Sequence, residues 1–102
     1  MKTILFLNKL DPQAISLAEA LREKGEEVDA VLIQDAVYLA LRGGRYSADV
    51  ERAVENGVRF YLLENDVEKR GIRHKLTADP ELVDYDALVE LLLREDRRVL
   101  NL

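Results

Sequence analysis

Residues 28–41 read VDAVLIQDAVYLAL, and two different patterns meet within them. The first six residues form an almost unbroken apolar run, which is typical of a strand covered on both faces. From Val37 onward the apolar residues recur at helical spacing, and Asp35 stands where a carboxylate can cap the start of a helix. The stretch therefore predicts a central parallel strand followed by a short helix. Gln34 and Asp35 then lie at the carboxyl end of the strand, where open α/β sheets usually hold ligands.

Similar patterns lie on both sides of this stretch. Further strands are predicted over 3–7, 58–63, 81–83 and 99–102. Helix starts are predicted at Asp11-Pro12, Ser47, Asn65 with Glu68 as a capping box, and Asp84, whose helix carries an apolar stripe of Tyr85, Leu88, Val89 and Leu92. Charges of both signs alternate over 94–98, which predicts a solvated turn rather than an RNA-binding patch.

Strands that alternate with helices at this spacing predict right-handed crossovers and a parallel sheet. We expect one domain over residues 1–102, a three-layer α/β/α sandwich with a parallel sheet of four to five strands. If the strands follow the common order 2-1-3-4, the ends of the first and third strands bring Asn8, Lys9 and Glu64 to one crevice, beside Gln34 and Asp35.

Composition narrows the possible functions. The chain of 102 residues is 48% hydrophobic and 34% charged, and it carries no apolar run long enough to span a membrane, so we expect a cytoplasmic protein. Its net charge of −5 gives no general attraction to nucleic acid. Since there is no cysteine, the chain can form neither a disulfide nor a persulfide. His74 has no metal ligands at suitable spacing, and we expect neither a metal nor a cofactor.

Three segments together resemble a known family. Residues 31–38, 60–72 and 82–89 are similar to the signature segments of the DsrH/TusB family of the DsrE/DsrF/DsrH superfamily, and 6–9 is similar to its opening. The resemblance implies a small three-layer α/β protein that assembles with DsrE/DsrF-like or TusC/TusD-like partners. Such assemblies pass persulfide sulfur toward 2-thiolation of the tRNA wobble uridine, or serve sulfur oxidation.

The sequence differs from that family in the residues that carry sulfur chemistry. It lacks the cysteine that some members keep, and Leu100-Asn101-Leu102 replaces a common C-terminal tryptophan. The resemblance therefore implies a subunit that is not an enzyme and that binds partners, or itself as a homo-oligomer, without carrying sulfur. The alternative is a small-ligand-binding protein or enzyme that uses the crevice at the strand ends. Its only support is analogy with other proteins of this fold class.

Candidate contact residues have ordinary explanations as well. Asp35 is explained as a helix cap, and Asp66 and Arg70 as a solvated pair spaced i, i+4. Tyr38 is either a core residue or an anchor at an interface, where tyrosine is enriched. Gln34 caps nothing obvious, so its side chain is available to a ligand or to the backbone of a partner.

Overall fold

A computed structural model describes residues 2–102. The longest helix has 11 residues, and no helix in the described chain is long and apolar enough to cross a membrane. The elements are β1 (Lys2–Leu7), α1 (Gln13–Glu23), β2 (Glu27–Leu32), the 3₁₀ helix η1 (Gln34–Ala40), α2 (Ser47–Glu55), β3 (Arg59–Leu63), α3 (Glu64–Lys69), the 3₁₀ helix η2 (Arg73–Lys75), β4 (Glu81–Val83), α4 (Tyr85–Leu93) and β5 (Arg97–Asn101).

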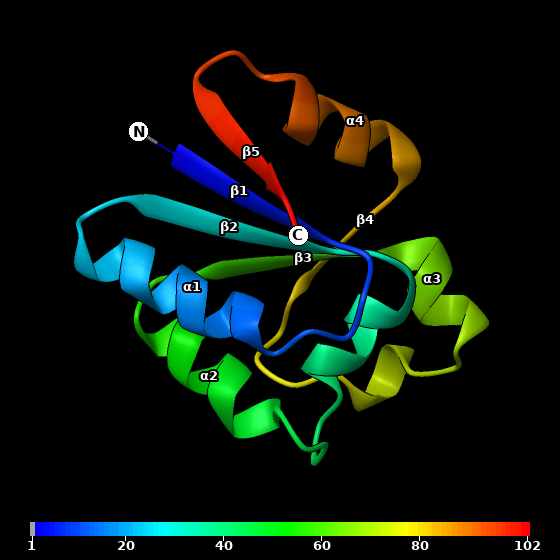
Figure 1. Ribbon diagram of the computed structural model, residues 1–102. Helices are drawn as coiled ribbons and strands as arrows, with labels where there is room; N and C mark the ends of the chain where they lie inside the picture. The colour runs from blue at the N-terminus through cyan, green and yellow to red at the C-terminus, as the bar shows by residue number, and fades with distance from the viewer. Residues whose placement is uncertain (1) are drawn as a thin grey trace.

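The five strands form one parallel sheet in the order β4-β3-β2-β1-β5 (Figure 1). The expected parallel α/β fold is confirmed, but the expected order 2-1-3-4 is wrong. The first four strands advance in one direction, and the last connection returns to the other edge beside β1. A right-handed crossover that reverses direction must place its helix on the opposite face. Figure 1 accordingly shows α1 and α2 on one side of the sheet and α4 on the other.

Strand β2 is the middle strand, as its apolar run predicts. Five of its six residues are buried. Because side chains alternate along a strand, Ala30 and Leu32 pack against the face that carries α1 and α2, whereas Val31 packs against the face that carries α4. Asp29 is the exception to the apolar pattern, because its carboxylate is buried beside Lys2.

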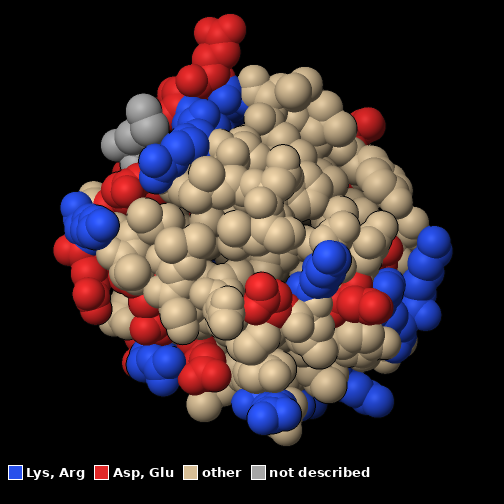
Figure 2. Space-filling view, in the orientation of Figure 1, with Lys and Arg blue, Asp and Glu red and all other residues tan. Residues whose placement is uncertain are grey.

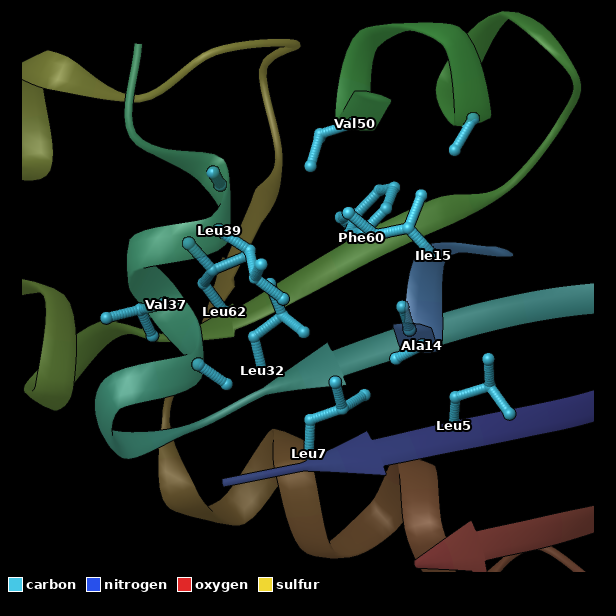
Figure 3. Close-up of a cluster of buried hydrophobic side chains, with 14 of the residues drawn as sticks. Leu5, Leu7, Ala14, Ile15, Leu32, Val37, Leu39, Val50, Phe60 and Leu62 are labelled. Atoms are coloured by element: carbon cyan, nitrogen blue, oxygen red, sulfur yellow. The ribbon is translucent and has the colours of Figure 1, made fainter. Parts of the chain in front are cut away.

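The larger core lies on the face that α1, η1 and α2 cover (Figure 3). Figure 3 shows side chains of β1, β2 and β3 pointing toward these three helices. Leu62 on β3 is fully buried, and burial of one such side chain contributes about 1.5–3 kcal/mol. The core includes Leu5, Leu7, Ala14, Ile15, Leu32, Val37, Leu39, Val50, Phe60 and Leu62.

The second core is smaller, since α4 covers its face of the sheet alone. Its buried members are Ile4, Val31, Leu63 and Leu88. The predicted stripe on α4 is only partly confirmed. Leu88 is buried and Leu92 packs against this core, but Tyr85 and Val89 face outward. This helix therefore has apolar residues on its outer side as well.

Short-range sequence signals account for several helix ends, although Ser47 begins α2 without a side-chain cap bond. The Asp11 carboxylate accepts a hydrogen bond from the backbone N–H of Gln13 at 3.0 Å, and the Asp84 carboxylate accepts one from Ala87 at 2.8 Å. Gly25 and Gly71 end helices with φ of 86° and 64°, a conformation that glycine adopts without strain. The predicted turn over 94–98 is shorter than expected, because β5 already begins at Arg97.

Candidate functional site

Polar residues gather where β2 and β3 end. These two strands are neighbours, with Leu32 paired to Leu62, so the segments that follow them begin side by side. Helix η1 begins at Gln34 and α3 begins at Glu64, and both lie at the same end of the sheet in Figure 1. We call Gln34, Asp35, Tyr38, Asp66 and Arg70 the carboxyl-edge cluster.

Asp66 fixes the start of η1. Its Oδ2 accepts a hydrogen bond of 2.7 Å from the backbone N–H of Gln34, and the residue is buried. Gln34 has φ of 51°, in the left-handed region that costs a residue other than glycine about 1–2 kcal/mol. A short hydrogen bond to a charged acceptor compensates for strain of this size. The carboxylate of Asp66 therefore holds the chain in a turn that a glutamine would otherwise avoid.

Arg70 joins the two helices. Its Nη2 donates to Asp35 Oδ1 at 2.9 Å, and its Nη1 donates to the backbone oxygen of Asp66 at 3.1 Å and lies 3.7 Å from Asp66 Oδ1. The guanidinium also lies over the ring of Tyr38, 5.7 Å from its centroid. The hydrogen bond to Asp35 is the main cause that raises the pKa of Arg70 above its ordinary value, so the side chain stays charged.

Two of the capping predictions at this edge are wrong. Asp35 is 69% exposed and makes no cap bond, because its carboxylate pairs with Arg70 instead. The capping box of Asn65 and Glu68 does not form either. Asn65 donates to the hydroxyl of Tyr85 at 3.4 Å, and Glu68 accepts from Arg73. In each case the side chain hydrogen-bonds to a residue outside its own helix rather than to the backbone at the helix start. Such distant partners cannot be predicted from the sequence alone.

The predicted crevice does not form as expected. Since β2 lies between β1 and β3, Asn8 and Lys9 follow a strand roughly 10 Å from the one that leads to Glu64. Asn8 and Lys9 are exposed, and Glu64 pairs with Arg73 at 3.4 Å. The larger clefts of the described chain, of about 460, 300, 230 and 200 Å³, are lined by other residues. The structure thus joins five of the eight predicted contact residues.

The cluster is suited to recognition rather than to covalent chemistry. It presents to solvent the carboxylate of Asp35, the side chain of Gln34 and the half-exposed ring of Tyr38, all on a backbone that Asp66 and Arg70 hold in place. The sequence supplies no thiol anywhere. Among residues 2–102, no group of three His, Asp or Glu side chains is arranged to hold a metal ion. What remains is a fixed set of hydrogen-bonding groups around an aromatic ring.

Comparisons with known proteins agree with the fold. A model of the family described as "DsrH like protein" matches residues 12–98. Protein TusB of Pectobacterium parmentieri is 31% identical over 88 residues, which are 86% of this chain and 90% of that protein. Protein TusB of Yersinia pestis (strain Pestoides F) is 28% identical over 96 residues, which are 94% of this chain and 98% of that protein.

Solved structures are similar over the full chain. The crystal structure of the ychN protein from E. coli superposes with a TM-score of 0.84 at 24% identity, and 100% of each chain is covered. Protein MTH1491 from Methanobacterium thermoautotrophicum superposes with a TM-score of 0.81 at 17% identity, covering 99% of this chain and 98% of that one. At these identities the likeness shows the fold alone.

Proposed function

The chain belongs to the DsrH family, and from this premise we propose that it is a partner-binding subunit of a sulfur-relay assembly that carries no persulfide itself. The observation that carries the proposal is the absence of any cysteine from a chain that otherwise matches the family over most of its length. A persulfide needs a thiolate to hold it. The role left to this subunit is to bind and position proteins that have one.

The carboxyl-edge cluster supports this role as one contact surface. Its backbone is fixed by the bonds of Asp66 and Arg70, so little conformational entropy is lost when a partner binds. Tyr38 is 37% exposed and stacks under the guanidinium of Arg70. A tyrosine held beside an arginine is the kind of anchor on which protein interfaces often depend.

Helix α4 supports the role with a second surface. Tyr85, Val89 and Leu93 recur at i, i+4 and i+8 and are 57%, 49% and 74% exposed. We call these three residues the α4 patch. In Figure 2 the surface over α4 and the neighbouring part of β5 carries few charged side chains. Exposed apolar residues in a row on one helix face are typical of a protein-binding surface.

The proposal is tested by co-purification with DsrE/DsrF-type proteins that carry cysteine. We expect a stable complex with the original chain, and we expect Tyr38→Ala and Arg70→Ala to weaken it by about tenfold or more, as for residues at the centre of an interface. Leu93→Glu tests the α4 patch in the same assay. The matched control is Arg45→Ala, because Arg45 lies over the ring of Tyr46 at the same 5.7 Å, outside both surfaces.

Two results would contradict the proposal. One is a chain that associates with none of these proteins while tRNA thiolation and sulfur oxidation proceed normally in a deletion strain. The other is a complex that the Arg45→Ala variant weakens as much as the Arg70→Ala variant does. In the second case the loss would reflect general charge and not the carboxyl-edge cluster.

A further inference from the structure

A cleft of about 460 Å³ lies between α4 and the sheet. The strands contribute Lys2, Arg59 and Arg97 to its lining, and α4 and the segment after it contribute Leu91 and Arg94. These strand residues stand at the amino ends of β1, β3 and β5, so the cations that they bring to the cleft are at the opposite end of the sheet from the carboxyl-edge cluster (Figure 1). It belongs to neither of the contact surfaces proposed above.

The register of the sheet brings these charges together. Lys2 pairs with Arg97 across β1 and β5, and Asp29 pairs with Arg59 across β2 and β3. Each of them lies two residues before a side chain that packs in the core beneath α4, and alternation along a strand therefore turns it to the same face. Those core side chains are Ile4, Val31, Tyr61 and Val99.

Arg97 is the most deeply buried of these cations. Its side chain is only 3% exposed. Its Nε lies 3.3 Å from the carboxylate of Asp96, which is itself mostly in solvent, and its Nη1 lies 3.5 Å from the backbone oxygen of Leu91. Both distances are beyond the usual range for N–H···O bonds. A guanidinium has five N–H donors, and burial without good partners is costly.

The other charged groups of the cleft do not meet this need. Lys2 is neutralised by the buried carboxylate of Asp29, which does not itself line the cleft and lies 3.0 Å from Lys2 Nζ. Asp84 caps α4 through the N–H of Ala87. Glu81 and Glu90 also line the cleft, but both are exposed residues that water can solvate. Among the residues that line the cleft, Arg97 is therefore the buried charge that is held only by long hydrogen bonds.

We propose that this cleft binds a small molecule through an oxyanion group, a carboxylate or a phosphate, that Arg97 holds, with Arg59 lining the same cleft. The planar fork of a guanidinium matches two oxygens of either group. Tyr61 and Leu91 line the same cleft and offer apolar surface to the rest of the molecule. A ligand oxygen would accept shorter hydrogen bonds from the Arg97 guanidinium than Asp96 and Leu91 do.

The test uses the full-length chain labelled with ¹⁵N and titrated with sodium phosphate, and in a second arm with sodium acetate, at constant ionic strength. We expect saturable shifts of backbone amide signals at residues 2, 29, 59, 61 and 97 for at least one anion. Arg97→Gln should weaken binding by about tenfold or more, because hydrogen bonds to a charged group are lost. Arg97→Lys keeps the charge but loses the planar fork, so its affinity for the anion should lie between those of the original chain and Arg97→Gln.

The matched control is Arg45→Gln, which removes an exposed arginine far from the cleft in sequence and should leave the affinity unchanged. Arg59→Gln changes an exposed residue and tests the site even if Arg97 variants fold poorly; it should weaken binding several-fold. The proposal is overturned if neither anion gives saturable shifts, if the shifts cluster at 34–38 and 64–70, or if Arg45→Gln weakens binding as much as Arg97→Gln. No partner is present, so the result is independent of the proposed relay role.

Discussion

Charged side chains at the two ends of the sheet differ in how well they are hydrogen-bonded. At the carboxyl end, hydrogen bonds of 2.7–3.1 Å join Gln34, Asp35, Asp66 and Arg70. At the amino end, Arg97 makes bonds of 3.3 and 3.5 Å, and no residue within 2–102 directs a hydrogen bond to Asp29 Oδ2 although Lys2 Nζ is near. A satisfied network fixes a shape that a partner can recognise, whereas unsatisfied buried groups favour a ligand that completes them. Substitutions at four residues test this contrast.

The largest effect is expected at Asp66. Asp66→Ala leaves the N–H of Gln34 without its acceptor and removes a charge next to Arg70, so we expect the free energy of unfolding to fall by about 2 kcal/mol. Urea denaturation at unchanged m-value measures this change. The control is Asp49→Ala, which removes a carboxylate from an exposed pair with Arg52 and should cost at most about 0.5 kcal/mol. Equal losses from both would mean that the network has no special strength.

Arg70 comes next. Arg70→Ala removes the bonds to Asp35 and to the backbone of Asp66 and the contact with the Tyr38 ring, and we expect a loss of about 1 kcal/mol because the side chain is partly in solvent. Arg45→Ala breaks a contact with Tyr46 of the same geometry and should cost less than half as much. Thermal unfolding of the two variants side by side gives the comparison, and an equal fall in Tm would contradict it.

Gln34 is expected to respond with opposite signs to two substitutions. Gln34→Gly relieves the left-handed strain and should raise stability by about 0.5–1 kcal/mol, after the larger entropy of glycine in the unfolded chain is included. Gln34→Val should lower stability, because a β-branched residue tolerates positive φ poorly. Chemical denaturation of both variants measures the difference. If Gln34→Gly is the less stable of the two, the strain at this turn is not real.

The smallest change in stability is expected at the amino end. Arg97→Met replaces a buried, poorly bonded charge with an apolar side chain of similar length, and such exchanges are often neutral or stabilising. We expect the free energy of unfolding to stay within about 1 kcal/mol of the original or to rise, while phosphate or acetate binding is lost. A loss of unfolding free energy as large as that of Asp66→Ala would show that Arg97 stabilises the fold and would contradict this prediction.

Local patterns in the sequence were enough to predict the five strands and the helices other than η2. The apolar run over 28–33 identified the middle strand, and Asp11 and Asp84 were recognised as helix caps because the N–H groups that donate to them are only two or three residues away. Strand order was not predictable in the same way. Every βαβ unit is right-handed, but nothing in the local pattern says to which edge the last strand returns. The position of β5 therefore had to come from the structure.

The candidate site was predicted in part for the same reason. Gln34 was singled out by its position at a strand end and Asp66 by its i, i+4 spacing from Arg70. The pair of Asp35 and Arg70, however, joins residues 35 apart, and a carboxylate at a helix start is normally read as a cap. Arg97 was placed in a solvated turn because its neighbours are charged. Its burial depends on the position of β5 beneath α4, and no pattern in the neighbouring residues predicts that position.

We propose that this chain brings proteins together in a sulfur relay without holding the sulfur. Native mass spectrometry tests this on the chain purified with cysteine-bearing DsrE/DsrF-type partners and loaded from a sulfur donor. We expect a stable complex in which the added sulfur is found on a partner subunit and never on this chain. A chain that stays unassociated throughout, or that itself gains the sulfur, would contradict it.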